Sequence, residues 1–315
     1  MARTQTATAA AGARDLAGVT QRPARSLWRD AWFQFRRHRL AMGGLFVLTF
    51  FVLATLIGPF LWTADYEKLD FAKAFVSPGR EHPFGTDDLG RDIFARALYG
   101  GRVSIAVGVV AVLIAVTLGT LVGAVSGYFG GQIDMALMRL TDIFLSLPIL
   151  PLLLLTIYLF RDSLRQAFGP ELGIFLLMVG VIGVLTWMPT ARLVRASFLS
   201  LKQKEFVEAA RCVGARDRRI ITVHILPNVM SPVLVAATVG VGAAIITESA
   251  LSFLGLGFPP DFPTWGRLLF DAQNFIDIAP YWALFPGMLI FLTVLSINYM
   301  GDGLRDALDP RRTGH

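Results

Sequence analysis

The chain has 315 residues, of which 54% are hydrophobic and only 17% are charged, and its mean hydropathy is +0.58. This composition excludes an ordinary soluble domain, in which about a quarter of the residues are charged, and indicates a membrane protein. The net charge of +6 does not indicate nucleic-acid binding, because the basic residues lie beside apolar runs as membrane anchors do. The single cysteine, Cys212, excludes an internal disulfide and a cysteine-based metal site.

The N-terminal region precedes the first apolar run. Residues 1–26 contain almost no large apolar side chains, which predicts a disordered cytoplasmic tail. Residues 27–39 hold Trp28, Trp32 and Phe35 at helical spacing among cationic side chains. This pattern favours a short amphipathic helix in the inner interface of the membrane, where it can contact lipid. The alternative is that the stretch only extends the first span.

Six apolar stretches are long enough to cross a hydrocarbon core about 30 Å thick. They cover residues 40–62, 103–129, 143–160, 172–191, 229–247 (with an extension to 256) and 278–301. The first is too long for the apolar part of a signal peptide, so we expect a retained anchor. The sequence therefore predicts an all-α membrane protein with six transmembrane helices.

The distribution of Lys and Arg predicts the orientation, because loops rich in these residues stay in the cytoplasm. Basic residues concentrate ahead of the first span and in the link between the fourth and fifth spans. Both termini are therefore expected in the cytoplasm, with residues 302–315 as a tail, while 63–102 forms an extracytoplasmic segment. Residues 103–301 form a core of five transmembrane helices with a cytoplasmic loop at about 199–228.

The extracytoplasmic segment ends in "HPFGTDDLGRDIFARALYGGRVSIAVG". Thr86 or Asp87 is expected to cap a helix that leads directly into the second span. The charged side chains around this cap are expected to be solvated or paired with one another, with a binding role as the alternative. They are Asp87, Asp88, Arg91 and Asp92.

Glycines recur every four residues in the second span and so lie along one stripe of the helix. The stripe consists of Gly119, Gly123, Gly127 and Gly131. Because two helix backbones approach closely where side chains are absent, the stripe predicts a packing face without chemistry.

Two acidic residues lie in or beside apolar spans, where charge is energetically expensive. Asp142 is expected to pair with Arg139 on the same helix. Glu248 either lines a polar pathway or lies near the outer boundary of the fifth span. Both carboxylates are therefore candidates for a pathway or gating role.

The loop between the fourth and fifth spans contains "EFVEAARCVGARDRRIITVHILPN". Residues 199–212 favour a helix, Gly214 permits a sharp turn, and 216–226 favour a second helix that ends at Pro227. An inert basic loop is the alternative interpretation. The mixture of charged, small and apolar side chains instead favours a surface that fits a groove.

This loop resembles the EAA motif of permease subunits in ATP-binding-cassette importers, since Glu-Ala-Ala is followed after three residues by Gly and later by Leu-Pro. His224 departs from the general motif, and "HILPN" resembles the peptide-transporter branch. Other stretches extend the resemblance over nearly the whole chain. They include "SGYFGGQIDMALMRLTDIFLSLP", "ESALSFLGLGFPPDFPTWGRLL" and "GDGLRDALDPR". The chain is similar to the DppC/OppC type, the second permease of dipeptide, oligopeptide and nickel importers.

The resemblance implies the type I ABC importer permease fold in a bacterial inner membrane, without catalytic activity, cofactor or metal in this chain. ATP and Mg²⁺ would be used by two cytoplasmic ATPase subunits. The other expected partners are a related permease and an extracytoplasmic substrate-binding protein. Peptides are the expected cargo, with nickel or another small solute as the alternative. The coupling loop would act through Glu208, Ala209, Ala210, Gly214, Leu226 and Pro227.

An ion-coupled secondary transporter is a less favoured alternative. The sequence contains no Gly-Lys pair and hence no phosphate-binding P-loop, so the chain cannot supply its own ATPase. A proton- or sodium-coupled carrier would need buried ionisable residues beyond Asp142 and Glu248.

Overall fold

The computed structural model describes residues 27–308, except for the side chains of residues 27, 28 and 30. The predicted tail at 1–26 and the last seven residues lie outside this range. Within it, the chain is built from helices, and its β-structure is limited to one isolated bridge between Thr86 and Asp92. The predicted all-α class is confirmed.

The first two helices are separate. Helix α2 (Leu27–Arg37) ends before His38, and α3 (Arg39–Leu61) begins after it. The His38 ring caps α3, because its Nδ1 accepts a hydrogen bond from the Ala41 N–H at 3.1 Å. The structure thus breaks the chain where the sequence predicts a distinct N-terminal helix.

Pro59 interrupts the hydrogen bonding of α3 because proline has no N–H to donate to the carbonyl of Thr55. Arg102 supplies the missing donor, with Nε 2.6 Å from the Thr55 oxygen and a terminal nitrogen 2.6 Å from the Leu56 oxygen. This contact attaches α3 to its neighbour, α4.

Helix α4 (Ile93–Phe129) runs without a break from the segment before it into the second apolar stretch, as the sequence predicts. The predicted cap was wrong, because Asp92 rather than Thr86 or Asp87 accepts from the free Ala95 N–H, at 2.8 Å. Asp87 instead pairs with Arg91 at 2.6 Å, and both side chains are buried. His82 binds Asp92 at 2.8 Å. Three of the four charges around the cap, Asp87, Arg91 and Asp92, are therefore paired locally, and the Asp87–Arg91 pair is hidden from solvent.

The third and fourth predicted spans have different boundaries in the structure. Helices α5 (Gly131–Ser146) and α6 (Ile149–Phe168) meet at an angle of 87°, and α7 (Pro170–Leu185) and α8 (Met188–Leu201) at 42°. Pro148 explains the first break, because it disfavours helical geometry at Leu147. Four unbroken helices are long and apolar enough to cross a membrane, and the number rises to six if each bent pair forms one span.

The C-terminal half begins with α9 (Glu205–Cys212), α10 (Asp217–Arg219) and a π-helical turn (Ile220–Ile225). It continues with α11 (Leu226–Phe253), α12 (Trp265–Ala272) and α13 (Pro280–Leu308). Helix α13 runs through Leu308, so residues 302–308 of the predicted C-terminal tail are helical.

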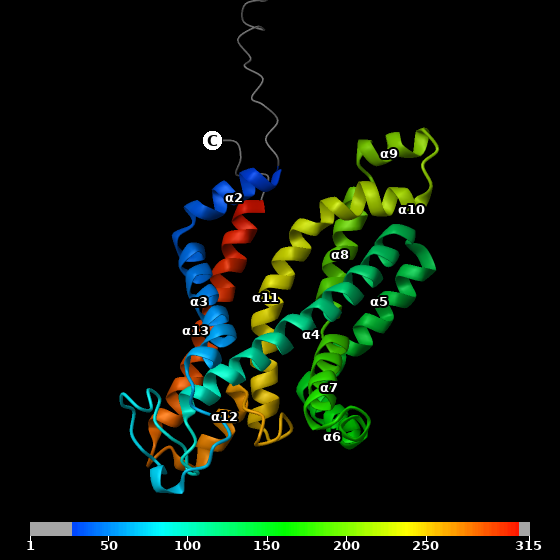
Figure 1. Cartoon of the computed structure of the whole chain (residues 1–315). Coiled ribbons are helices and arrows are strands. Elements are labelled where there is room, and N and C mark those ends of the chain that lie inside the picture. Colours follow the sequence, from blue (N-terminus) through cyan, green and yellow to red (C-terminus); the bar gives the residue numbers. More distant parts are fainter. Residues whose placement is uncertain (1–26, 309–315) are drawn as a thin grey trace, which may run out of the picture.

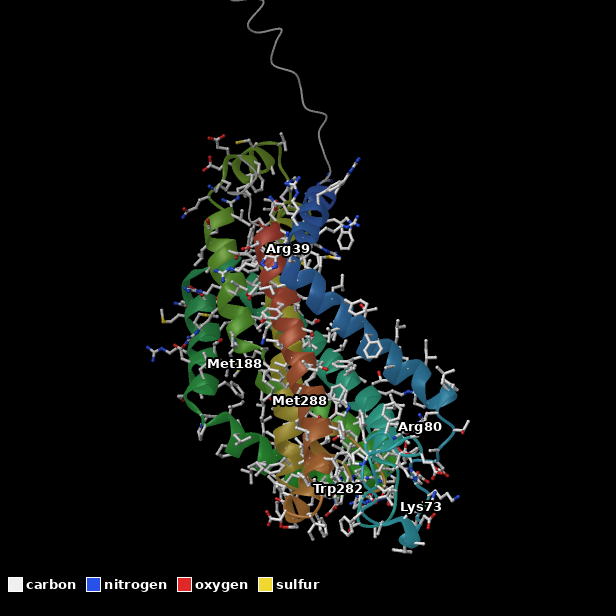
Figure 2. The ribbon with its side chains drawn as sticks, turned by 90° about the vertical axis from the view of Figure 1, so that its left-hand side faces the viewer. Arg39, Lys73, Arg80, Met188, Trp282 and Met288 are labelled. Carbon is white, nitrogen blue, oxygen red and sulfur yellow. The ribbon has the colours of Figure 1, made fainter. Side chains whose placement is uncertain are left out.

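Helix α4 is the centre of the packing and contacts α3, α5, α7, α8, α11 and α12. Figure 1 shows α2, α9, α10 and the end of α13 at one end of the molecule, while α6, α12 and the segment before α4 lie at the other. In Figure 2, Arg39 lies near the first end and Lys73 and Arg80 near the second. The surface formed by the loop at 199–228 and α2 therefore lies at the opposite end of the molecule from the surface formed by α12 and the segment before α4.

Candidate functional site

The loop at 199–228 forms a helical hairpin. Gly214 has φ of +79°, a left-handed conformation that side chains with a Cβ resist. Its N–H donates to the Arg211 oxygen at 2.9 Å and the next N–H, of Ala215, donates to the Ala210 oxygen at 3.0 Å, closing the end of α9. The turn that the sequence predicts at Gly214 is therefore present.

The hairpin has one buried and one exposed face. Val207 and Ala210 pack against Phe198 of α8 and Val229 of α11 in one apolar cluster. Glu208 and Ala209 are exposed, as is Phe206. Ala210 therefore packs within this chain, and of the two alanines in the motif Ala209 is the one that a partner can approach.

The tip of the hairpin exposes an apolar side chain, because Val213 keeps 85% of its surface accessible. Gly214 beside it is also exposed, and no atom lies within 4 Å of the position that a Cβ would take. Val213 and Gly214 line a hollow together with Arg216 and Arg219, so the tip of the hairpin presents an exposed apolar side chain beside basic ones.

The second arm of the hairpin does not end at Pro227. Residues Asp217–Phe253 form one continuous helical segment, with Leu226 half-buried and Pro227 exposed at the start of α11. Pro227 has no N–H to donate within the helix. The wider π-helical turn directly before Leu226 accommodates it without a break in the helical segment. Movement of this arm is therefore transmitted directly to α11.

Side chains connect the hairpin to the end of α4. The Tyr128 hydroxyl lies 2.5 Å from the Asp217 carboxylate in the second arm. Lys202, just before the first arm, donates to the Gly127 carbonyl at 3.1 Å. One end of α4 is thus bonded to the second arm and to the residue that leads into the first, two contacts that the sequence motif does not predict.

A second set of contacts connects α5 to α8. The Arg195 guanidinium forms two bonds with Asp134, each 2.5 Å long. Ser126 of α4 also bonds to Asp134. A two-point bond of this kind fixes orientation as well as distance, so α4, α5 and α8 are aligned near the hairpin.

The glycine stripe lies against α8. A Cβ at Gly119 would lie 2.7 Å from the Trp187 oxygen, and one at Gly127 would lie 2.6 Å from Phe198 Cβ; at Gly123 it would overlap the Ala191 carbonyl. Gly131 lies beyond the turn and has open space around it. The stripe is thus a packing face within the chain, and it ends at Gly127.

Asp142 and Glu248 occupy different environments. Asp142 pairs with Arg192 of α8 at 2.5 Å rather than with Arg139, and both partners are more than half exposed. Glu248 is fully buried, and its carboxylate accepts from Ser104 at 3.1 Å and from Ser252 at 2.8 Å. In this conformation Glu248 connects α4 and α11 inside the protein.

Comparison with known proteins identifies the chain. The family described as "Binding-protein-dependent transport system inner membrane component" matches residues 115–314. The "N-terminal TM domain of oligopeptide transport permease C" matches residues 26–78. The chain belongs to this permease family. The permease is the non-catalytic membrane component of an ABC importer, and ATP hydrolysis resides in partner subunits.

Curated relatives cover nearly the whole permease. It is 42% identical over 286 residues to the dipeptide transport system permease protein DppC of Alkalihalophilus pseudofirmus, covering 91% of this chain and 90% of the relative. It is 42% identical over 289 residues to the oligopeptide transport system permease protein OppC of Haemophilus influenzae, covering 91% and 89%. It is also 38% identical over 295 residues to the glutathione transport system permease protein GsiD of Pectobacterium atrosepticum, covering 93% and 94%.

The fold has a counterpart among solved structures. The permease superposes on a chain of the MetNI methionine ABC transporter in an inward-facing conformation, with a TM-score of 0.53 and 18% identity. The match covers 67% of this chain and 94% of that chain. This likeness confirms the predicted ABC importer permease fold.

A buried charge cluster at the end opposite the hairpin was missed in the sequence analysis. Arg96 is 1% exposed and lies 3.6 Å from Asp271, which also pairs with Arg267 at 2.9 Å. Burial raises the pKa of Asp271, while the two arginines oppose the shift. The sequence contains one signal of this cluster: Arg96 lies on the apolar face of the first turns of α4.

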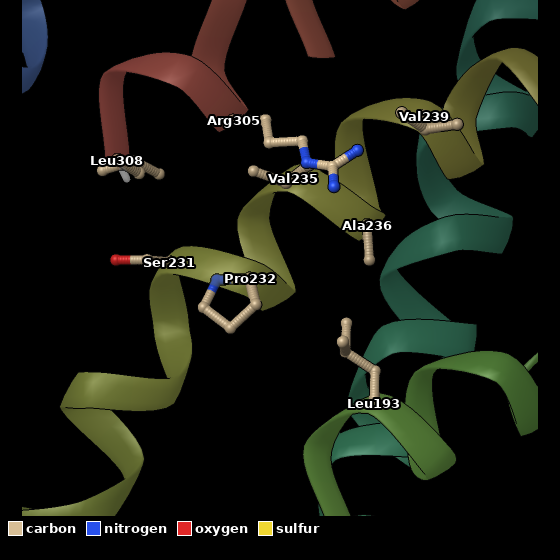
Figure 3. Close-up of a pocket in the computed structure, with 8 residues that line it drawn as sticks. All are labelled: Leu193, Ser231, Pro232, Val235, Ala236, Val239, Arg305 and Leu308. Carbon is tan, nitrogen blue, oxygen red and sulfur yellow. The ribbon is translucent and has the colours of Figure 1, made fainter. Parts of the chain in front are cut away.

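A cavity of about 460 Å³ lies between α8, α11 and α13 at the hairpin end. Apolar side chains, among them Leu193, Val235 and Ala236, form most of its lining. Figure 3 shows the Arg305 side chain extending from α13 toward Val235 and Ala236. A guanidinium there can bind a carboxylate or a phosphate.

Proposed function

We propose that the permease imports di- or oligopeptides across the bacterial inner membrane, forming half of the translocation pathway. The relatives named for dipeptide, oligopeptide and glutathione transport support a peptide cargo. The observation that carries the proposal is the hairpin, whose exposed face is available to a partner while its buried face is bonded to the membrane helices.

The proposed orientation puts the hairpin and both termini in the cytoplasm. The hairpin, α2 and the end of α13 gather at one end of the molecule (Figure 1), and the first two carry dense positive charge. Such clusters stay on the cytoplasmic side of a bilayer. The segment before α4 and α12 would then face outward, toward a substrate-binding protein.

The proposed partners are a second, related permease and two ATPase subunits that bind ATP and Mg²⁺. One ATPase would cover Glu208, Ala209 and the Val213 tip, which are exposed on the hairpin. When the ATPases close on ATP, they would displace α9. The continuous helix after Asp217 would transmit the displacement to α11, and the Tyr128 and Lys202 bonds would transmit it to α4.

The test is uptake by the full complex reconstituted in vesicles. Labelled dipeptides and longer peptides should enter with ATP, and a protonophore at constant ATP should leave uptake unchanged. Uptake of Ni²⁺ but not of peptides would overturn the proposal that the cargo is a peptide. Uptake that follows the proton gradient without ATP would overturn the importer mechanism in favour of a secondary transporter.

Docking at the hairpin is tested by Glu208→Arg, which reverses an exposed charge on α9. The variant should release the ATPase on purification, whereas Glu171→Arg, an exposed carboxylate at the start of α7, should retain it. Equal amounts of ATPase bound to wild type and Glu208→Arg would contradict the proposed contact.

A further inference from the structure

Two neighbouring apolar cavities, together called the crevice, follow one another along α11 and α13. The first, about 250 Å³, is lined by residues of α2, α3, α11 and α13, and the second, about 220 Å³, by residues of α3, α4, α11 and α13. Thr238 lines both cavities and so lies between them. Along α3 the lining passes from Leu45 to Leu48 and Val52 in the same order.

The crevice has the length of a lipid chain. On α13 its lining extends from Leu308 to Thr293, which corresponds to about 22 Å along a helix. Half of a hydrocarbon core is about 15 Å thick. A crevice of this length that begins at the membrane interface would reach past the middle of one leaflet.

The mouth of the crevice is cationic. Trp32 and Phe35 of α2 line it, and the Arg36 guanidinium lies 5.9 Å from the centre of the Trp32 ring. Residues 27–39 hold four arginines and one aspartate. Arg36 and Arg37 are exposed there, and no hydrogen bond or ion pair to either occurs within the part of the chain that the structure describes.

We propose that this crevice binds an anionic phospholipid, with one acyl chain between α3, α11 and α13 and the headgroup phosphate on Arg36 and Arg37. The apolar lining of the two cavities suits an acyl chain, and the arginines at the mouth match a negative headgroup in the interface. A bound lipid would join α2 to α11, the helix that continues from the hairpin. This site does not depend on which solute is transported.

The crevice is tested by a filling substitution. Thr238→Phe places an aromatic ring between the two cavities. The Thr238 hydroxyl that is lost bonds only to its own helix, at the Leu234 oxygen. Thr117→Phe is the matched control, because Thr117 makes the same bond to Leu113 but is exposed on α4. The readout is the phospholipid that remains on the purified complex, measured by native mass spectrometry.

The mouth is tested by Arg36→Gln together with Arg37→Gln, which leaves the apolar crevice intact. The control is Arg80→Gln, an exposed arginine at the opposite end from Arg39 (Figure 2). Each complex is equilibrated with equal amounts of phosphatidylglycerol and phosphatidylcholine, which differ in headgroup charge.

Wild type and both controls should retain phosphatidylglycerol about tenfold over phosphatidylcholine. Thr238→Phe should lose the retained lipid, and the arginine variant should keep lipid but lose the preference. Equal retention of the two lipids by wild type would overturn the proposal, as would unchanged retention by Thr238→Phe. Cross-linking of a cysteine at Leu45 to the second permease, with no bound lipid, would assign the crevice to that subunit instead.

Discussion

Replacing Tyr128 with phenylalanine removes one hydroxyl that joins α4 to the hairpin. The hydroxyl lies 2.5 Å from the Asp217 carboxylate, Tyr128 is buried, and Asp217 is exposed. A hydrogen bond to a charged group contributes about 1.5–3 kcal/mol, and the exposure of Asp217 reduces this to about 1 kcal/mol. Such a loss corresponds to about a fivefold change in an equilibrium. We expect the hairpin of Tyr128→Phe to move partly without α4.

The assay is peptide uptake and ATP hydrolysis by the same reconstituted vesicles. Tyr128→Phe should lower peptide uptake per ATP hydrolysed by about fivefold while hydrolysis continues. Asp217→Asn should have a similar effect, and the double variant should be no worse than either single variant, because both remove one bond. Tyr158→Phe is the matched control, since Tyr158 is 70% exposed on α6. Additive losses in the double variant, or a wild-type ratio in Tyr128→Phe, would refute the link.

Three further substitutions follow from the geometry. Gly214→Pro should abolish uptake without preventing membrane insertion, because proline cannot adopt φ of +79°; uptake and insertion are measured in the same cells, and normal uptake would contradict the role of the turn. Gly123→Leu should lower the melting temperature of the purified complex, since its Cβ overlaps the Ala191 carbonyl, whereas Gly180→Leu, with open space, should not. Burial and the Asp87 charge raise the pKa of Asp88 in the folded state. The Asp88 carboxyl therefore destabilises the fold as pH rises from about 4, its unfolded pKa, through the raised pKa. Asp88→Asn should raise the melting temperature at pH values above the raised pKa but not at pH values below about 4, and an equal change in both pH ranges would exclude this titration.

Local sequence features predicted the parts of the fold that depend on neighbouring residues. The continuity of α4, the close packing at Gly119, Gly123 and Gly127, and the turn at Gly214 each follow from residues within a few turns of helix. Each of these features depends on the conformational freedom of glycine or on the length of an apolar run, and a short stretch of sequence is enough to show either one.

The missed features depend on partners far apart in the chain. Asp142 pairs with Arg192, fifty residues away, because the bend after α7 brings α8 beside α5. Helical spacing could only suggest Arg139. The break at Pro148 was missed for a different reason. A hydropathy average over a window of residues does not depend on the direction in which the helix runs, so it does not detect the bend of 87° between α5 and α6.

The candidate site was predicted in position but not in its connections. The motif located Glu208 and Gly214, whereas Tyr128 and Lys202 lie on or next to other helices and have no motif of their own. Pro227 was misjudged because the π-helical turn before it is a property of the folded backbone. Burial of Ala210 likewise depends on Phe198 and Val229.

The length of α4 has a mechanical consequence. Its 37 residues span about 55 Å, so a rotation of about 5° at one end displaces the other by roughly 5 Å. One end is bonded to the hairpin through Tyr128, and the other is capped by Asp92, which also holds His82 of the opposite surface. If a protein bound at the His82 end changes the affinity of the hairpin for its partner, thermodynamic reciprocity requires that partner to change the affinity at the His82 end by the same factor.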